Sequence, residues 1–574
     1  MFTRNRKGRR HHRIFQIVAL TLSAALFGSF CCSCSAFHKS RPVNAIPCKV
    51  VETEFNLEAM PNMVIFIADD LRFDTWNDPV FQSPNIDSLS ASGVTFTSNF
   101  VTNSLCAPSR CSLFTGLYPH AYGHRILDNQ LRPGEENLLK ILKDSGYAVV
   151  LAGKNDLLNP AAFDQSVTEY ISLKKIGIGL IKDAIKEKPL KEKFEIIRLT
   201  LDLLRGKHTI LDPDARKIAR IVGSVWESPF PEDNRFYRSF YLGERDSAQG
   251  DYEKKLTEAV NRYLDDPPRK PFCLVVAFSL PHTPYTVEEP YFSMYDRSAI
   301  TAPIPPVLAD KPHFMQEIHT RYGLDALSEE DFREIRATYY GMASKLDDLV
   351  GSVLNKLKEK GLYDDSMITF ISDNGDYVGD YGLTEKWSTG YQDCLLHMPL
   401  IIKLPGNAHA ATTLNQLVQS IDVFPTIMEV AGIHTPYVHS GKSLLPLITG
   451  KQDIHREAVF ALQGYNPEDF SQHESHAGFV VDPDHIYYEK IRLGMEDPST
   501  EARSAMIRTS QWKLVVRTAG REELYNLVSD PRELTNLIDN PEYAETALKL
   551  RLDLLDFFLH TSDHLHWDRK RNMY

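Results

Sequence analysis

The chain has 574 residues, of which 43% are apolar and 24% charged, as is typical of a globular protein. This composition excludes a disordered, a collagen-like and a multi-span membrane chain, and the length suits a large catalytic domain with a smaller companion. The formal net charge of −12 argues against nucleic acid as a partner, because proteins that bind nucleic acid present basic surfaces.

The first 36 residues have the features of a targeting segment. They hold six basic residues and no acidic residue, followed by an apolar run over residues 14–30 and then by small residues suited to cleavage, Ser33 to Ala36. The segment predicts an exported protein that is periplasmic, attached to the cell surface or secreted. Two alternatives to cleavage stay open, and each would attach the chain to a membrane: an uncleaved helical anchor, or a lipid on Cys31, Cys32 or Cys34.

Four short apolar runs predict buried parallel strands, because they carry apolar and β-branched residues without polar alternation. They lie at residues 64–68, 147–151, 273–278 and 367–371, and residues 399–403 predict a fifth strand. Helical patterns fall between them at residues 135–145, 328–360 and 421–430. Strands that alternate with helices predict a doubly wound α/β domain with a mostly parallel sheet, over residues 62–450.

Two segments depart from this alternation. Residues 155–250 carry dense charge and helical stretches, and we predict an insertion over one edge of the sheet. From residue 451 the pattern changes to short strands at residues 459–462, 505–508 and 512–516 and a final amphipathic helix at residues 541–560. Residues 451–574 therefore predict a smaller C-terminal α+β domain with an antiparallel sheet.

Polar side chains follow the ends of the four predicted strands. They are Asp69-Asp70, Lys154, His282 and Asp373-Asn374. Because ligands bind beyond the carboxyl ends of the strands in open α/β sheets, we expect these side chains to converge. The two acidic pairs offer only oxygen, which suits Ca²⁺ or Mg²⁺ and argues against zinc. In the alternative interpretation each pair merely starts a solvated turn, but recurrence at several strand ends argues against it.

The stretch Cys106-Ala107-Pro108-Ser109-Arg110, followed by Thr115-Gly116, resembles the C-x-P-S-R signature of the sulfatases. These enzymes belong to the alkaline phosphatase-like superfamily and include arylsulfatases and iduronate sulfatases. The resemblance implies an alkaline phosphatase-like fold and a sulfuric ester hydrolase. It also implies that a formylglycine-generating enzyme oxidises Cys106 to formylglycine (3-oxoalanine), whose hydrated aldehyde attacks sulfur. The alternative for Cys106 is a buried structural cysteine paired with Cys111.

The resemblance extends to other motifs and implies roles for their residues. Asp69-Asp70-Leu71-Arg72 and Ser372-Asp373-Asn374-Gly375 are similar to the family's metal motifs, so Asp69, Asp70, Asp373 and Asn374 would bind the cation together with the Cys106 product. Arg110 and Lys154 would stabilise formylglycine and sulfate, and Lys386 resembles a second sulfate-binding lysine. His282 would approach the leaving oxygen as its acid. Residues 506–514 and 523–533 are similar to the family's small-domain strand and the turn after it.

One position departs from the family pattern. The family commonly has G-K-x-H, whereas this chain has Gly153-Lys154-Asn155-Asp156. Asp156 would act as a general base in place of the histidine, with its pKa depressed by nearby cations. The alternative is that Asp156 contacts substrate hydroxyls and the proton goes elsewhere. Five further residues flank the motifs and are candidates for the leaving-group pocket: His124, Arg125, Trp387, Tyr391 and His397.

These observations predict an exported, calcium-dependent formylglycine sulfatase that acts on a sulfate ester, with sulfated carbohydrate as the substrate class implied by the family. A second hypothesis is a phosphonate monoester or phosphodiester hydrolase of the same superfamily, because sulfate, phosphate and phosphonate share a tetrahedral anionic geometry. A third is a non-catalytic surface protein that binds sulfated glycans, although a binder has no need of a modifiable cysteine.

Overall fold

The structure is a computed structural model that describes residues 60–172, 189, 196–198, 237–247, 251–466 and 486–562. The predicted targeting segment and most of the predicted insertion lie outside the described residues. Among the described helices, none has both the length and the apolar character needed to cross a bilayer.

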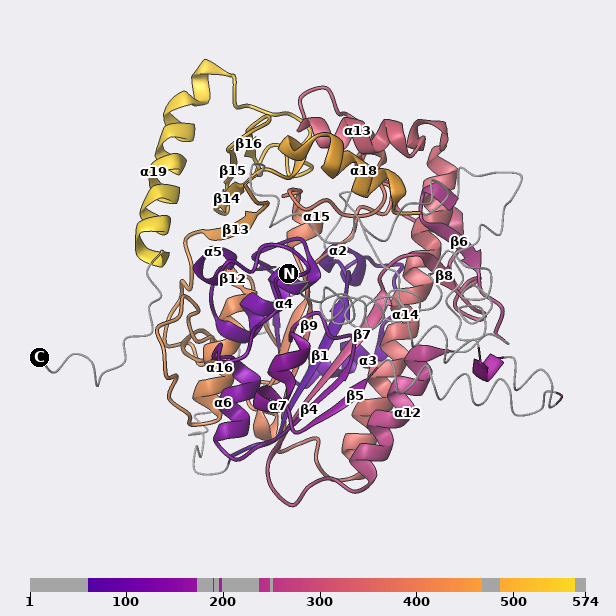
Figure 1. Cartoon of the computed structure of the whole chain (residues 1–574), viewed down its shortest axis with the longest axis vertical. Helices are drawn as coiled ribbons and strands as arrows, with labels where there is room; N and C mark the ends of the chain where they lie inside the picture. The colour runs from indigo at the N-terminus through magenta and orange to yellow at the C-terminus, as the bar shows by residue number, and fades with distance from the viewer. Residues whose placement is uncertain are drawn as a thin grey trace, which may run out of the picture.

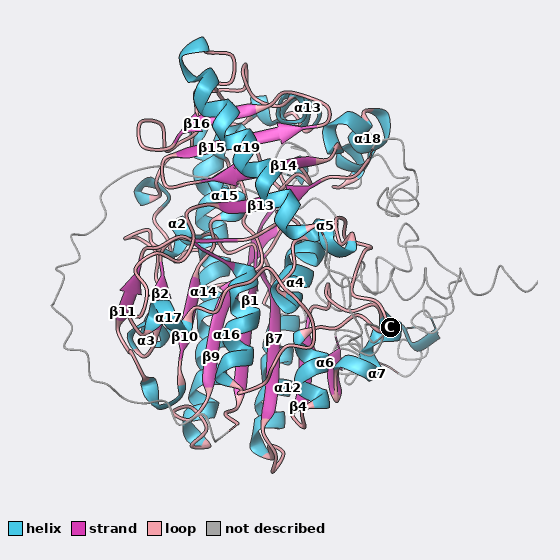
Figure 2. Cartoon of the chain, turned by 90° about the vertical axis from the view of Figure 1, so that its left-hand side faces the viewer, coloured by secondary structure: helices cyan, strands magenta, loops and turns pink. Residues whose placement is uncertain are grey.

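An eight-stranded sheet forms the centre of the larger part of the molecule (Figures 1 and 2). Its four central strands are mutually parallel, as predicted, and lie in the order β9 (Met367–Ser372), β1 (Met63–Asp69), β7 (Phe272–Pro281) and β4 (Ala148–Gly153). Residues of β1 alternate between two hydrophobic cores, Val64 and Phe66 in one and Ile65 and Ile67 in the other. The sheet is therefore covered on both faces, as expected from the continuous apolar runs.

Helices pack on each face of this sheet. α3 (Pro84–Ala91), α12 (Tyr252–Asp265) and α14 (Glu329–Glu359) contribute to one core. α4 (Cys106–Thr115), α6 (Leu138–Asp144) and α16 (Val423–Val430) contribute to the other. A capping box is present at the start of α14, where Ser328 and Asp331 each accept a hydrogen bond from the other's backbone N–H. The prediction of a doubly wound α/β fold is confirmed.

The outer strands differ from the prediction in two ways. β10 (Leu400–Lys403) was expected among parallel strands, but it pairs antiparallel with β9 and with β2 (Val94–Phe96). β5 (Glu169–Ser172) falls within the segment predicted as an insertion, yet it pairs with β4 at one edge of the sheet. β11 (Thr412–Leu414) lies at the other edge. Strand direction depends on the partner strand, which local sequence does not reveal.

A second sheet has four antiparallel strands: β13 (Val459–Gln463), β14 (Ser504–Arg508), β15 (Trp512–Arg517) and β16 (Glu523–Asn526). The first three were predicted, whereas β16 was interpreted as a turn. α19 (Ala544–Thr561) covers one face of this sheet and lies at the periphery of the molecule (Figure 1, yellow). The sequence analysis did not identify α12, α13 (His313–Arg321) or α18 (Tyr488–Glu496).

Candidate active site

The carboxyl ends of the four central strands bring the predicted side chains together. β1 ends at Asp69, and the other three strands end one residue before Lys154, His282 and Asp373. Asp70 has a φ of +72°, a conformation uncommon for a residue with a side chain. The turn at Asp70 is held by the hydroxyl of Ser372, which accepts a hydrogen bond from the Leu71 N–H at 2.8 Å.

The signature stretch forms the first turn of α4, which begins at Cys106. Arg110, one turn later, points to the same place and donates from Nε to Asp373 Oδ2 at 2.7 Å and from Nη2 to Asp69 Oδ2 at 3.2 Å. Ser109 donates its hydroxyl to the carbonyl oxygen of Asp373. The helix start therefore places Cys106 and a guanidinium beside the two strand ends, as predicted. Cys106 and Cys111 are both free thiols, so the disulfide alternative is wrong.

The thiol of Cys106 lies among cations. Its Sγ is 3.5 Å from Lys386 Nζ and 3.7 Å from Lys154 Nζ, and the group is 1% exposed. Burial and the charge of Asp69 raise the pKa of the thiol well above its ordinary value, despite the two lysines. An unmodified Cys106 is therefore a protonated, weakly nucleophilic thiol at neutral pH, with two ammonium groups beside it.

The acidic side chains fit a hard divalent cation. Asp69, Asp70 and Asp373 each offer a carboxylate oxygen, and the three oxygens lie within 4.8 Å of one another. Three oxygens have no hydrogen-bond partner although they are buried: Asp70 Oδ2, Asp373 Oδ1 and Asn374 Oδ1. Buried oxygens without partners are costly unless a ligand fills the space between them. Burial, then Asp69 and Asp373, raise the pKa of Asp70 to about 7 despite its ion pair with Lys386, and a bound cation would reverse that shift.

Asp376 is a further acidic residue of this region that the sequence analysis missed. Its Oδ1 accepts hydrogen bonds from the Tyr285 hydroxyl and from the Val378 N–H, both at 2.8 Å, and its Oδ2 is buried without a hydrogen-bond partner. Burial and the charge of Asp70 raise its pKa well above the ordinary value. In the sequence, only its position two residues after Asn374 could have indicated that Asp376 lies near the site.

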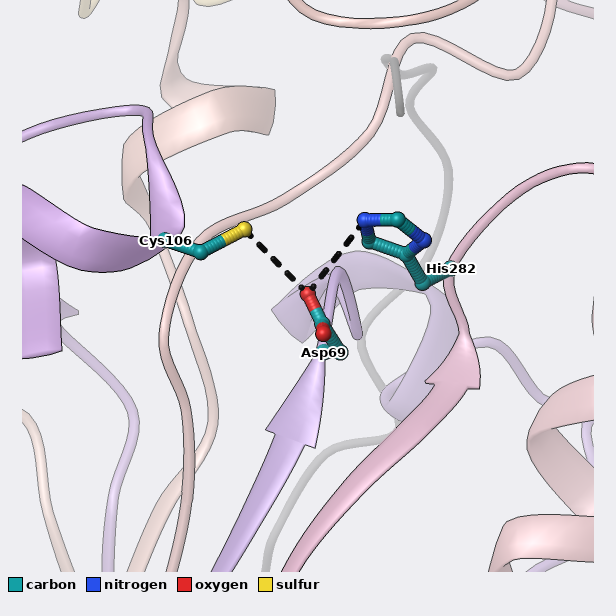
Figure 3. A group of neighbouring side chains, drawn as sticks. All are labelled: Asp69, Cys106 and His282. Atoms are coloured by element: carbon teal, nitrogen blue, oxygen red, sulfur yellow. Dashed lines mark hydrogen bonds and ion pairs between the residues drawn. The ribbon is translucent and has the colours of Figure 1, made fainter. Parts of the chain in front are cut away.

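Asp69, Cys106 and His282 form a second set of potential metal ligands (Figure 3). Asp69 Oδ1 lies 3.4 Å from Cys106 Sγ and 3.8 Å from His282 Nε2. A cation bound at Cys106 would lie next to two ammonium groups, which would repel it. The surroundings therefore favour an oxyanion pocket over a zinc site.

His282 lies beside Lys154 and somewhat farther from the carboxylates of Asp69 and Asp70. Its Nε2 lies 3.3 Å from Lys154 Nζ and its Nδ1 lies 3.1 Å from the carbonyl oxygen of Thr283. Since an ammonium only donates and a carbonyl only accepts, these partners assign a neutral ring with the proton on Nδ1. Burial, then Lys154 and Lys386, lower the pKa of His282 well below its ordinary value, which agrees with this assignment.

Asp156, the residue that departs from the family pattern, forms an ion pair with Lys154. Its Oδ2 lies 3.1 Å from Lys154 Nζ, and its side chain is 25% exposed. Burial raises the pKa of Asp156, but Lys154 and Arg110 outweigh burial and lower it overall. The described contacts of Asp156 therefore place it beside the lysine that touches the thiol.

A strained turn positions Lys386, whose Nζ lies 2.5 Å from Asp70 Oδ1. Glu385, directly before it, has a φ of +71°. Lys490 on α18 donates to the Glu385 carboxylate at 2.6 Å and to the carbonyl oxygen of Lys386 at 2.9 Å. Sequence analysis identified Lys386 but missed this support, because Lys490 lies in an unremarkable charged helix about a hundred residues away.

The five flanking residues have partners elsewhere. His124 lies between the Asn129 carbonyl and Glu135, and Trp387 donates to the Thr500 carbonyl. Tyr391 donates to Ser504, and His397 stacks between Phe73 and Phe100. Among the residues that the structure describes, Arg125 donates to the backbone carbonyls of Gln463 and Gly464, at 3.5 and 3.4 Å. These contacts favour packing roles over roles in a leaving-group pocket.

The comparisons with known proteins agree with this site. Residues 61–433 match the model of the Sulfatase family. The chain is 28% identical over 533 residues to the multifunctional alkaline phosphatase superfamily protein PehA of Trinickia caryophylli, which covers 86% of this chain and 96% of that protein. It is 26% identical over 510 residues to the choline-sulfatase of Rhizobium meliloti, covering 84% and 83%.

Solved structures share the fold. The phosphonate monoester hydrolase of Agrobacterium radiobacter superposes with a TM-score of 0.64 at 24% identity, covering 87% of this chain and 96% of that one. The corresponding enzyme of Silicibacter pomeroyi gives a TM-score of 0.66 at 22% identity, covering 88% and 96%. Because the family model spans well over half of the sequence, the chain belongs to the sulfatase family of the alkaline phosphatase-like superfamily and is a sulfatase enzyme.

Proposed function

We propose that this enzyme hydrolyses the sulfate ester of a carbohydrate, with Cys106 converted to formylglycine and Ca²⁺ held by Asp69, Asp70, Asp373 and Asn374. The observation that carries the proposal is the arrangement around one sulfur atom: two ammonium groups within 3.7 Å, and buried oxygens without partners beside them. Such a pocket suits a dianionic or monoanionic tetrahedral group. A curated relative of similar length, 21% identical over 537 residues, is the N-acetylglucosamine-6-O-sulfatase of Bacteroides thetaiotaomicron, which supports a carbohydrate substrate.

The cationic side chains have two tasks in this proposal, sulfate binding by the two lysines and positioning of α4 by Arg110. Lys154 is paired with Asp69 and Lys386 with Asp70, and both ammonium groups lie next to the position of the nucleophile. There they would bind the sulfate oxygens. Arg110 is held by Asp69 and Asp373 and keeps the start of α4 in register with the strand ends. Formylglycine supplies a nucleophilic oxygen for attack on sulfur, and the cation supplies charge neutralisation.

His282 is proposed to protonate the leaving oxygen. The ring is neutral without substrate, because burial, and then Lys154 and Lys386, lower its pKa. The negative charge of a bound sulfate ester opposes those two lysines and favours the protonated ring. Proton donation would therefore depend on substrate binding, and the ring would stay neutral in the free enzyme.

Mass spectrometry and paired assays test the proposal. Protein from a host that makes formylglycine should carry an aldehyde, in place of the thiol, on the peptide containing Cys106, and should release sulfate from an aryl sulfate. Cys106→Ala should lose turnover with its fold intact. Chelation should abolish turnover, and Ca²⁺ should restore it better than Zn²⁺. An unmodified thiol and no turnover in that host would instead favour a sulfated-glycan-binding protein.

A second candidate is phosphonate or phosphodiester hydrolysis, which the fold shared with two phosphonate monoester hydrolases supports. Assays on aryl sulfate and aryl phosphonate esters, run on the same preparation, decide between the two by the ratio of kcat/KM values. A panel of defined sulfated saccharides then identifies the sugar and the sulfate position.

The first 36 residues support export as part of the same proposal. Cell fractionation should find the protein outside the cytoplasm. N-terminal sequencing that starts shortly after Ala36 would indicate cleavage, and an intact N-terminus in the membrane fraction would indicate an anchor.

A further inference from the structure

The C-terminal helix α19 has two apolar faces. On its inner face Ala547, Leu550, Leu554 and Phe557 are buried against the second sheet. On its outer face four leucines remain open to solvent: Leu548 is 57% exposed, Leu552 57%, Leu555 55% and Leu559 71%. α19 lies at the periphery, and its outer face points away from the sheet that it covers (Figures 1 and 2).

The outer leucines follow the spacing of a coiled-coil seam. They recur at intervals of four, three and four residues, which places them at successive d, a, d and a positions of a heptad. A single exposed leucine needs no explanation, but four in line on one helix form a continuous apolar strip. The inner face already holds this helix on the sheet, so pairing requires no new helix formation.

We propose that the outer face of α19 binds the same face of a second copy of this chain, with the two helices antiparallel. A two-fold axis between residues 553 and 554 places Leu548 opposite the partner's Leu559 and Leu552 opposite the partner's Leu555. Every leucine of the strip then meets a leucine of the other copy. A seam that is complementary to itself in this way fits the closed two-fold symmetry of most dimers.

The charges beside the strip select the antiparallel direction. In this direction Lys549 lies near the partner's Asp556, and symmetry repeats the pair. Glu545, one layer before Leu548, faces the partner's Ser562. In a parallel pair Glu545 would face the partner's Glu545 at the same layer, and like charges would repel. Within its own helix Lys549 pairs with Asp553 at 2.5 Å and Asp556 lies 3.4 Å from His560. Such exposed pairs are weak, so Lys549 and Asp556 can exchange these partners for each other across the seam.

The flanking charges disfavour a lipid surface as the occupant. Lys549 and Arg551 alternate with Asp553 and Asp556 along the exposed and half-exposed faces, so the strip has no predominantly basic border. Helices that lie on anionic membranes combine an apolar face with a basic polar face. Four leucines per copy make a small interface, so we expect a dimer that dissociates on dilution.

Sedimentation velocity of the full-length chain, across about 1 to 100 μM, tests the proposal over the range of weak interfaces. We expect the wild type to shift from monomer to dimer in this range. The double variant Leu552→Asp/Leu555→Asp should stay monomeric throughout, with unchanged circular dichroism and sulfatase turnover. Met495→Asp is the matched control, because Met495 is an apolar residue on α18 with 61% exposure, away from α19. It should dimerise as the wild type does.

Charge exchange tests the direction. Lys549→Asp and Asp556→Lys should each weaken the dimer at least about tenfold, as expected for like charges brought together, and the two together should restore it. A wild type that stays monomeric at all concentrations, or a dimer that survives Leu552→Asp/Leu555→Asp, would overturn the proposal. A monomeric wild type that floats with lipid vesicles, with flotation lost in the leucine variant, would also overturn it. So would a dimer that forms only after deletion of residues 563–574.

Discussion

Lys513 connects the second sheet to the segment of Tyr391 and Asp393, which follows Lys386 in the chain. It lies on β15 with its side chain fully buried, and its Nζ lies 2.7 Å from Glu533 Oε1 and 2.5 Å from Asp393 Oδ1. The same ammonium donates to the carbonyl oxygen of Tyr391 at 3.0 Å. Lys513→Met therefore removes one cation and leaves the buried carboxylate of Glu533, the half-buried carboxylate of Asp393 and a carbonyl.

The expected cost of Lys513→Met follows from what remains. Asp393 keeps Arg508 at 2.7 Å, so Glu533 is the carboxylate that loses its ion pair within the described part of the chain. Removing one partner of a buried pair costs about 3–5 kcal/mol, and the retained Arg508 puts the expectation near about 3 kcal/mol. The matched control is Arg521→Met, which breaks the exposed Arg521–Asp539 pair and should cost about 0–1 kcal/mol.

Urea unfolding of both variants at several pH values measures this difference. The pKa of Glu533 is already raised by burial, with Lys513 opposing that shift, so the variant should raise it further. A native carboxyl with a raised pKa binds a proton that the unfolded chain has released, so its destabilisation grows as pH rises. The deficit of Lys513→Met should therefore be larger at pH 8 than at pH 5. A deficit equal to that of Arg521→Met, or one independent of pH, would refute this reasoning.

Three other predictions concern the site and its support. Asp156→Asn should lower kcat/KM about tenfold, the loss of one charge-assisted hydrogen bond to Lys154; a loss of about 10² or more would instead indicate a general base. Gly153→Ala should prevent folding, since its Cβ would lie 2.1 Å from the Ala277 oxygen at a φ of +95°; Gly123→Ala, with nothing within 4 Å, is the control for soluble yield. Burial raises the pKa of Glu253 to about 7, so stability should fall between about pH 4.5 and 7, and Glu253→Gln should be more stable than wild type at pH 8 by up to about 3 kcal/mol. Parallel stability–pH curves for Glu253→Gln and wild type would contradict the last prediction.

Sequence alone was sufficient for the central strands and the side chains at their ends. Apolar runs identify strands covered on both faces, and Asp69, Lys154, His282 and Asp373 each follow one of these runs within four residues. The order β9, β1, β7 and β4 then brings these residues together, as expected for neighbouring parallel strands. The proximity of Cys106 and Arg110 also needs only local structure, because residues four apart on one helix lie on the same face.

Tertiary structure alone decided which distant groups support the site. The antiparallel direction of β10, the strand β16 and the contacts of Lys490 and Lys513 depend on partners far away in sequence. In α19, composition shows leucines all around the helix, but only packing on the second sheet decides which of them are buried and which face solvent. Local patterns record the preferences of a segment for helix, strand or burial, whereas pairing and exposure are properties of the surfaces that meet when the chain folds.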